Sequence, residues 1–203
     1  MIGSEENEQE VKAMEKTTKR GRVYPLAAAA VVAAVLCVVG PWSIPIGPVP
    51  LSLATLIISL GVYVLGAKLA AASVLVYLLL GAVGLPVFSN YGAGLAKVAG
   101  PTGGYLVGYL ALALVGGWFV ERFHGSGLWG ALGLVLGTAL LYAFGTAWFV
   151  VQMEGATIGY ALGVCVVPFL VGDAAKIAIS SVLGPLLRRR ILAAGLLPSK
   201  ASP

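Results

Sequence analysis

Charged residues are scarce in this sequence. They make up 10% of its 203 residues, against about 25% in a typical soluble domain. Hydrophobic residues make up 59%, and the mean hydropathy is +0.97. A chain with so little charge does not form an ordinary soluble domain, and its composition predicts an integral membrane protein.

Cysteine is nearly absent. The two cysteines, Cys37 and Cys165, lie in apolar stretches and have no C-x-x-C spacing. This pattern indicates neither a disulfide framework nor a metal site. We expect both thiols to be packing residues, and we expect neither a metal nor a cofactor.

The sequence also lacks a phosphate-binding loop. The stretch GPTGGY, residues 100–105, is rich in glycine, but a P-loop requires G-x-x-x-x-G-K-[ST] after a strand, and no such lysine follows here. ATP binding by that route is therefore excluded. Energy for active transport would have to come from another subunit or from an ion gradient.

What the sequence has in abundance is long apolar runs. A spanning helix needs about 20 predominantly apolar residues, and six segments approach that length, so the sequence predicts an all-α membrane protein with six transmembrane helices. A further stretch, 155–165, is expected to be a half-buried loop or a short helix at the membrane surface. The six predicted helices are residues 24–42, 51–66, 69–85, 103–121, 127–151 and 166–187. The second and third are separated only by residues 66–68 and should form a tight helical hairpin.

The basic residues predict the orientation of these helices. The net charge of +5 does not indicate a nucleic-acid partner, because the basic residues flank apolar runs instead of alternating with aromatic residues on a soluble face. Short cytoplasmic loops carry an excess of Lys and Arg. Both termini are therefore predicted to be cytoplasmic, with only Lys97 outside. The basic residues then inside are Lys12, Lys16, Lys19, Arg20, Arg22, Lys68, Arg122, Arg188, Arg189, Arg190 and Lys200.

Three regions follow from these patterns. Residues 1–22 form a polar N-terminal tail, expected to be disordered or to lie on the membrane surface. Residues 23–190 form the six-helix membrane domain. Residues 191–203 form a short basic C-terminal tail, expected to lie at the anionic leaflet.

Two charged residues interrupt the last apolar run. Asp173 and Lys176 lie within VVPFLVGDAAKIAISSVLG, residues 166–184, where each costs about 2.5 to 3.5 kcal/mol at the centre of a spanning helix. A spacing of three places them on one helix face and within mutual reach. They are either an internal ion pair that holds the bundle together or a donor and acceptor at the end of a cavity open to the exterior. Charges inside a membrane are more often functional than structural.

A glycine-rich segment precedes the fourth predicted helix. Residues 86–105 are a candidate lid, because Phe88, Asn90 and Tyr105 combine apolar faces with polar tips, as small-molecule sites do. An equally supported interpretation is a turn needed only for packing.

Another candidate site is the sequence HGSG, residues 124–127, which places a serine beside the only histidine. An intramembrane hydrolase is disfavoured, because a nucleophile and its base are normally brought together from separate elements. A purely structural membrane subunit is the remaining alternative from another class.

Several linked motifs resemble one known family. GPVPLSLATL, YLLLGAVGLPVF, AGPTGGYLVGY and PFLVGDAAKIAI, in this order and spacing, look like those of the biotin-transporter substrate subunits, BioY. These are the S components of energy-coupling-factor (ECF) transporters. The resemblance covers about residues 24–190. It implies a six-helix subunit of the prokaryotic plasma membrane that captures biotin from outside and works with a transmembrane coupling subunit and two cytoplasmic ATPases.

The same resemblance implies a set of binding residues. The family's G-D-x-x-K motif matches Asp173 and Lys176, and the family's binding loop matches the segment with Phe88, Asn90 and Tyr105. Asn90 would pair with the ureido group of biotin, or would be a turn-forming residue only. The match implies a non-enzymatic subunit, with another small vitamin as an alternative ligand.

One family motif is altered here. The usual V-P-[IV]-T-L-Q-T-L reads VPLSLATL, so Ser52 keeps a hydroxyl while Ala54 replaces the amide of Gln. Ser52 remains a candidate binding residue, and the affinity or the water structure of the pocket is expected to differ at Ala54.

The first predicted helix carries two pairs of small residues with the spacing that lets another helix approach closely. In the family, such a face meets the coupling subunit. The alternative is packing within the protein's own bundle. The paired residues are Ala29 with Ala33 and Ala30 with Ala34.

Overall fold

The computed structural model describes residues 23–46 and 49–194 of the chain. The predicted tail 1–22 and most of the predicted tail 191–203 lie outside the described residues. The last helix continues to Ala193, three residues beyond the predicted boundary of the membrane domain.

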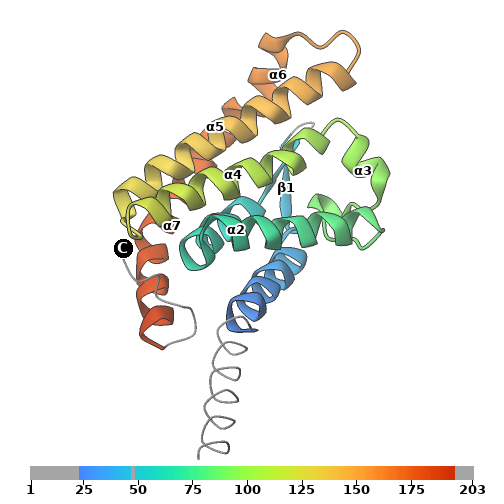
Figure 1. The fold of residues 1–203 in the computed structure, drawn as a ribbon. Coiled ribbons are helices and arrows are strands. Elements are labelled where there is room, and N and C mark those ends of the chain that lie inside the picture. Colours follow the sequence, from blue (N-terminus) through green and yellow to red (C-terminus); the bar gives the residue numbers. More distant parts are fainter. Residues whose placement is uncertain (1–22, 47–48, 195–203) are drawn as a thin grey trace, which may run out of the picture.

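The described chain is mostly helical (Figure 1). Four helices are long and apolar enough to cross a membrane: α2, α4, α5 and α7. The helix Val23–Val39 is apolar but shorter. The elements follow in the order Val23–Val39, β1 (Ser43–Ile46), β2 (Val49–Ser52), α2 (Ala54–Ala82), the 3-10 helix η1 (Ser89–Tyr91), α3 (Leu95–Ala99), α4 (Gly103–Arg122), α5 (Gly127–Gln152), α6 (Ile158–Cys165) and α7 (Val167–Ala193).

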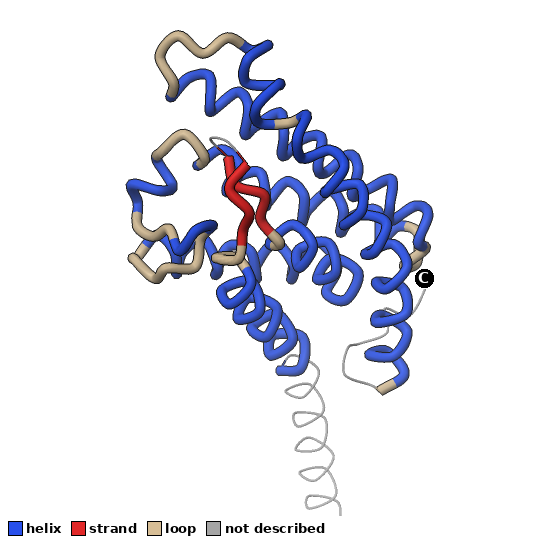
Figure 2. Tube along the Cα trace, turned by 180° about the vertical axis from the view of Figure 1, so that it is seen from behind, coloured by secondary structure: helices blue, strands red, loops and turns tan. Residues whose placement is uncertain are grey.

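The prediction of an all-α protein is wrong between the first two helices. Strands β1 and β2 form an antiparallel pair, with Pro45 opposite Pro50, seen in red in Figure 2. The residue before a proline favours an extended backbone. Proline is also tolerated in edge strands, and both strands of a two-stranded sheet are edge strands. The second predicted helix therefore begins at Ala54 instead of residue 51.

The second and third predicted helices are the two halves of α2. They meet at Gly66, whose φ of 75° and ψ of −175° are not helical. Both halves touch the same turn of the first helix: Ser73 Oγ donates to Ala29 O at 2.9 Å, and a Cβ at Gly61 would lie 3.0 Å from a methyl of Val32. The chain therefore doubles back at Gly66, as the predicted hairpin requires.

Glu121 explains why the break occurs at a glycine. The carboxylate Oε1 of Glu121 accepts a hydrogen bond from Ala67 N at 3.2 Å, which satisfies a backbone amide next to the break. A side chain at Gly66 would collide with this carboxylate. The positive φ and the close approach both require glycine here.

Helices α4 and α5 lie side by side and make the most extensive contact between any two described elements (Figures 1 and 2). A Cβ at Gly108 would lie 3.0 Å from Leu141 Cα, and a Cβ at Gly137 would lie 3.0 Å from Leu112 Cα. Small residues at these positions let the two backbones approach, as in other membrane bundles. This contact sets the positions of the tyrosines that α4 and α5 contribute to the site.

The tryptophans mark two ends of the bundle. Trp42 lies just before β1, and Trp148 donates from Nε1 to Gly100 O at 2.9 Å. We call this end of the bundle the hairpin end, after the β1–β2 hairpin that lies there. Trp118 and Trp129 lie near the turn between α4 and α5, at what we call the arginine end because Arg188–Arg190 are there. All four are at least 40% exposed. Exposed tryptophan at two levels is typical of the two membrane interfaces.

Candidate ligand-binding site

Helix α7 places the two charged residues on one buried face. Asp173 and Lys176 are each only 7% exposed, and Lys176 Nζ lies 2.9 Å from Asp173 Oδ1. The predicted ion pair is therefore present. It lies at the hairpin end, in the first half of α7.

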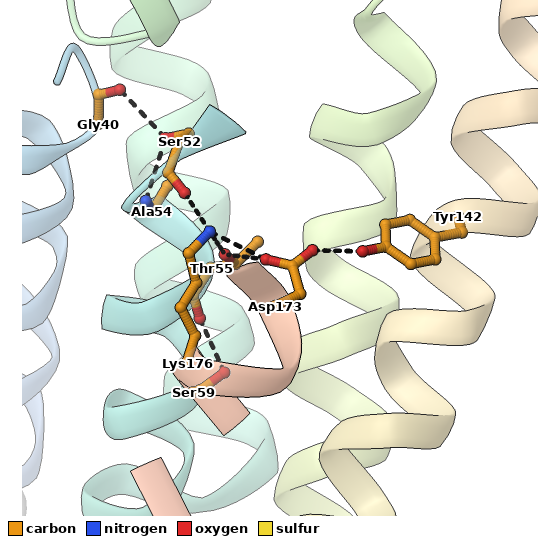
Figure 3. Close-up of polar contacts among 8 residues, drawn as sticks. All are labelled: Gly40, Ser52, Ala54, Thr55, Ser59, Tyr142, Asp173 and Lys176. Atoms are coloured by element: carbon orange, nitrogen blue, oxygen red, sulfur yellow. Dashed lines mark hydrogen bonds and ion pairs between the residues drawn. The ribbon is translucent and has the colours of Figure 1, made fainter. Parts of the chain in front are cut away.

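The ammonium group of Lys176 is fully hydrogen-bonded. An ammonium has three N–H donors, and here they reach Ser52 O at 2.6 Å, Thr55 Oγ1 at 3.0 Å and Asp173 Oδ1 at 2.9 Å. Figure 3 shows Lys176 rising from α7 into the junction between β2 and α2. These acceptors offset the cost of burying the charge.

The carboxylate of Asp173 lies between Lys176 and Tyr142, as Figure 3 shows. Its Oδ2 accepts from Tyr142 OH at 2.5 Å, and its Oδ1 accepts from Thr55 Oγ1 at 3.4 Å as well as from Lys176. Three helices, α2, α5 and α7, therefore meet at one carboxylate.

The end of β2 supplies the carbonyl that Lys176 uses. Ser52 is the last residue of the strand, and α2 begins two residues later at Ala54. The Ser52 hydroxyl donates to Gly40 O at 3.3 Å and accepts from Ala54 N at 3.0 Å. Ser52 therefore contacts the charged pair through its backbone oxygen, while its hydroxyl holds the strand-to-helix junction together.

A cavity of about 40 Å³ adjoins the charged pair. Its wall combines the charged pair, Ser52 and Thr55 with aromatic and aliphatic side chains. The lining residues are Val49, Pro50, Leu51, Ser52, Thr55, Tyr105, Tyr109, Leu141, Tyr142, Cys165, Phe169, Asp173 and Lys176. Since one water requires roughly 10 to 15 Å³ of such volume, a larger ligand enters only if the walls move apart.

The structure brings four of the six predicted binding residues together at this cavity: Asp173, Lys176, Ser52 and Tyr105. Ala54, where the family motif is altered, is fully buried and does not line the cavity.

Phe88 and Asn90, the other two predicted binding residues, do not line the cavity. The ring of Phe88 is fully buried and meets Tyr77 edge-on, with ring centroids 5.5 Å apart. Asn90 accepts from Ser43 Oγ at 2.9 Å and has a φ of 57°, the left-handed conformation that Asn tolerates in turns. In this structure both residues hold segment 86–105 against its neighbours, Phe88 against α2 and Asn90 against the residue that starts β1.

The two pairs of small residues in the first helix face different ways. Ala29 and Ala33 are buried at 8% and 3% exposure, and Ala29 O accepts the hydrogen bond from Ser73. Ala30 and Ala34 are exposed. Packing within the bundle therefore accounts for the first pair, and only the second pair remains open to a partner.

Sequence reasoning missed Thr55, Tyr109 and Tyr142. Tyr105 and Tyr109 are four residues apart, so both lie on one face of α4, and that spacing was a usable signal. Thr55 and Tyr142 reach Asp173 from 118 and 31 residues away. Nothing local in the sequence indicates those contacts.

Within residues 23–46 and 49–194, no three His, Cys, Asp or Glu side chains gather as a metal site would require. His124 and Ser126 lie at the arginine end, away from the charged pair, and Cys37 and Cys165 are both free thiols. The geometry supports noncovalent binding of a small molecule with both donor and acceptor groups.

Comparisons with known proteins agree on one family. A family model described as "BioY family" matches residues 10–193. A biotin transporter BioY of Thermotoga maritima is 40% identical over 155 residues, which are 76% of this chain and 90% of that protein. Biotin transporter BioY2 of Lactococcus lactis is 32% identical over 172 residues, covering 84% and 93% of the two chains.

A solved structure has the same fold. The crystal structure of the S component for biotin from an ECF-type ABC transporter superposes with a TM-score of 0.76 and 27% identity. The match covers 83% of this chain and 92% of that one.

Proposed function

The chain belongs to the BioY family, and on that premise we propose that it is the biotin-binding subunit of an ECF-type transporter. It is a transport subunit and not an enzyme. The observation that carries the proposal is the buried pair of Asp173 and Lys176, hydrogen-bonded on every side and lining a largely apolar cavity.

The chemistry of biotin complements this cavity. Its ureido ring has two N–H donors and a carbonyl acceptor, and its valerate tail ends in a carboxylate. Asp173 offers acceptor oxygens, and the Tyr142 hydroxyl, whose hydrogen goes to Asp173, offers a further acceptor. Lys176 would donate to the ligand by exchanging one of its three protein acceptors for a ligand oxygen. The thioether ring and the aliphatic tail would lie against apolar wall residues such as Leu141 and Phe169.

Binding would require the cavity to open. Its present volume of about 40 Å³ is too small for a bicyclic ligand. Residues 49–51 of β2 form one wall, and they belong to a two-stranded sheet that carries no third strand, so we propose that this hairpin is the wall that moves. Asn90 would act on binding by holding Ser43 and thereby positioning the hairpin, instead of touching the ligand.

The membrane topology is part of the proposal. The six spans would be Val23–Val39, the two halves of α2, α4, α5 and α7, with both termini in the cytoplasm of a prokaryotic cell and the hairpin end outside. Residues 54–65 rise only about 18 Å, less than the roughly 30 Å hydrocarbon core. The hairpin would complete that span, as nonhelical backbone does when it is buried in protein.

The proposed partners are biotin, membrane lipid, a transmembrane coupling subunit and two cytoplasmic ATPases. Since the sequence has no P-loop, the energy would come from the ATPases, and no cofactor of the chain's own is needed. The exposed pair Ala30 and Ala34 offers a small-residue face for the coupling subunit.

Equilibrium binding of biotin to the purified chain in detergent tests the ligand. The parent should bind biotin, and Asp173→Asn and Lys176→Ala should lose binding. Tyr160→Phe is the matched control, because Tyr160 is 52% exposed on α6 and does not line the cavity.

The alternatives predict other results. Another small vitamin that binds while biotin does not would replace biotin as the ligand. No stabilisation by any vitamin would favour the purely structural subunit, since a ligand of the folded state raises stability by mass action.

A further inference from the structure

A second cavity lies at the arginine end, opposite the charged pair. Its volume is about 420 Å³, against about 40 Å³ at the hairpin end. It is formed by the turn between α4 and α5 and by the last turns of α7. The lining includes Phe123, His124, Ser126, Pro185, Arg188 and Arg189.

The turn between α4 and α5 is shaped by close approaches. His124 and Gly125 both have positive φ, 53° and 77°. A Cβ at Gly125 would lie 2.7 Å from Arg188 Cδ, and a Cβ at Gly127 would lie 2.7 Å from Ser181 O. The start of α5 therefore lies directly on α7, beside the guanidinium of Arg188.

The charge of this cavity has one sign. Of its nine lining residues, all within the described part of the chain, two are arginines, one is a histidine and none is acidic. Arg188 Nη1 donates to Tyr63 O at 2.8 Å. This bond uses one of the five guanidinium N–H donors and holds the group in place at the cavity wall.

Apolar groups adjoin the arginines. Phe123, Pro185 and Leu192 line the same cavity. Trp129 stacks on Phe123 with ring centroids 4.4 Å apart, and it is 45% exposed. A cationic cavity with an apolar side, at a level marked by exposed tryptophan, matches the headgroup region of a bilayer.

We propose that this cavity binds a phosphate group. The guanidinium groups of Arg188 and Arg189, which both line the cavity, suit phosphate oxygens. The N-terminus of α5, where Ser126 makes no side-chain cap, adds backbone donors at the same cavity. An anionic phospholipid would present the phosphate together with an acyl chain for the apolar side. A free phosphate ion would use the arginines alone.

Native mass spectrometry of the full chain in neutral detergent tests the proposal. Phosphatidylglycerol, phosphatidylcholine or inorganic phosphate is titrated into the parent and into Arg189→Ala and Arg190→Ala. Arg190 is the matched control, since it is the adjacent exposed arginine and does not line the cavity. Biotin binding by each variant reports folding at the other end.

We expect the parent and Arg190→Ala to retain phosphatidylglycerol and Arg189→Ala to bind it about tenfold more weakly. Retention of phosphatidylglycerol over both other additives assigns the site to a lipid headgroup. The same selective loss seen with inorganic phosphate assigns it to a free anion.

Three results would overturn the proposal. Equal weakening in Arg189→Ala and Arg190→Ala would mean attraction by overall charge only. Absence of any bound phosphate compound in the parent would remove the site. Unchanged lipid binding in Arg189→Ala, together with weaker assembly with the coupling subunit, would make the cavity a protein contact.

Discussion

The two ends of α7 carry basic residues in opposite surroundings. At the hairpin end, Lys176 is 7% exposed and has three acceptors within 3.0 Å. At the arginine end, Arg189 is exposed and lines a cavity with no acidic side chain among its described lining residues. One helix thus carries a neutralised charge inside the bundle and an accumulated charge at its edge.

The difference shows how burial decides what a charge requires. A buried ion must be paired and hydrogen-bonded, so Lys176 depends on residues from β2, α2 and its own helix. An exposed arginine is solvated and needs no partner for stability. Single substitutions at the charged pair should therefore change the free energy of unfolding strongly. Substitutions at the arginine end should mainly change ligand binding there.

The largest effect is expected for Lys176→Ala. Removal of the ammonium leaves Asp173 buried without its counter-ion, which typically costs about 3 to 5 kcal/mol. Thermal unfolding in detergent measures the change. The double variant Asp173→Asn with Lys176→Met should recover much of the lost stability, because it leaves no buried charge at either position. A double variant as unstable as Lys176→Ala would contradict this account of the pair.

Tyr142→Phe should have the next largest effect. It removes the hydroxyl that donates to Asp173 Oδ2 and should cost about 1.5 to 3 kcal/mol, as for hydrogen bonds to charged groups. Biotin affinity should fall with it if the same oxygen meets the ligand. Tyr91→Phe is the control, since Tyr91 is 66% exposed. Equal effects of the two substitutions on unfolding would refute a specific role for Tyr142.

Gly184→Ala tests the packing between the two regions. A Cβ at Gly184 would collide with the ring of Tyr63, which is fully buried. Overpacking of this kind costs about 1 to 3 kcal/mol. Gly163→Ala on α6 is the control, because no atom lies within 4 Å of its added Cβ, and that helix should gain up to about 1 kcal/mol. The measurement is the free energy of unfolding of each variant. Equal stability of Gly184→Ala and Gly163→Ala would contradict tight packing at Gly184.

Arg189→Ala should have the smallest effect on stability, within about 0.5 kcal/mol, as for other exposed substitutions. Its consequence should appear only in phosphate binding at the arginine end. A loss of stability comparable to that of Lys176→Ala would mean that the two ends do not differ in the way described, and unfolding curves of the two variants in one detergent make the comparison direct.

The sequence predicted the long helices well. Residues 103–121 and 127–151 were expected, and α4 and α5 span Gly103–Arg122 and Gly127–Gln152. Continuous apolar runs bounded by polar turns leave little choice of element type. The break between the second and third predicted helices was also placed within a residue or two, because a lysine close to a glycine interrupts the apolar run there. The linker was predicted at residues 66–68, and only Gly66 is non-helical.

The β1–β2 hairpin escaped prediction, although Pro45 and Pro50 were visible signals of extended backbone. Residues 43–52 are mostly apolar, like the ends of the two helices that precede and follow them, so composition does not distinguish strand from helix here. The backbone preference imposed by proline is the local signal that favours strand over helix. The length criterion for a membrane span does not take this preference into account.

By itself, the sequence determined the membrane class, the long helices and the pairing of Asp173 with Lys176, because composition, periodicity and a spacing of three act within one segment. The tertiary structure alone decided that Thr55, Tyr142 and the Ser52 carbonyl complete that pair, and that Ala29 packs inside while Ala30 faces outward. Those outcomes depend on contacts between segments far apart in the chain. A buried charge must be hydrogen-bonded, and which residues can serve as its partners is decided only when the helices pack together.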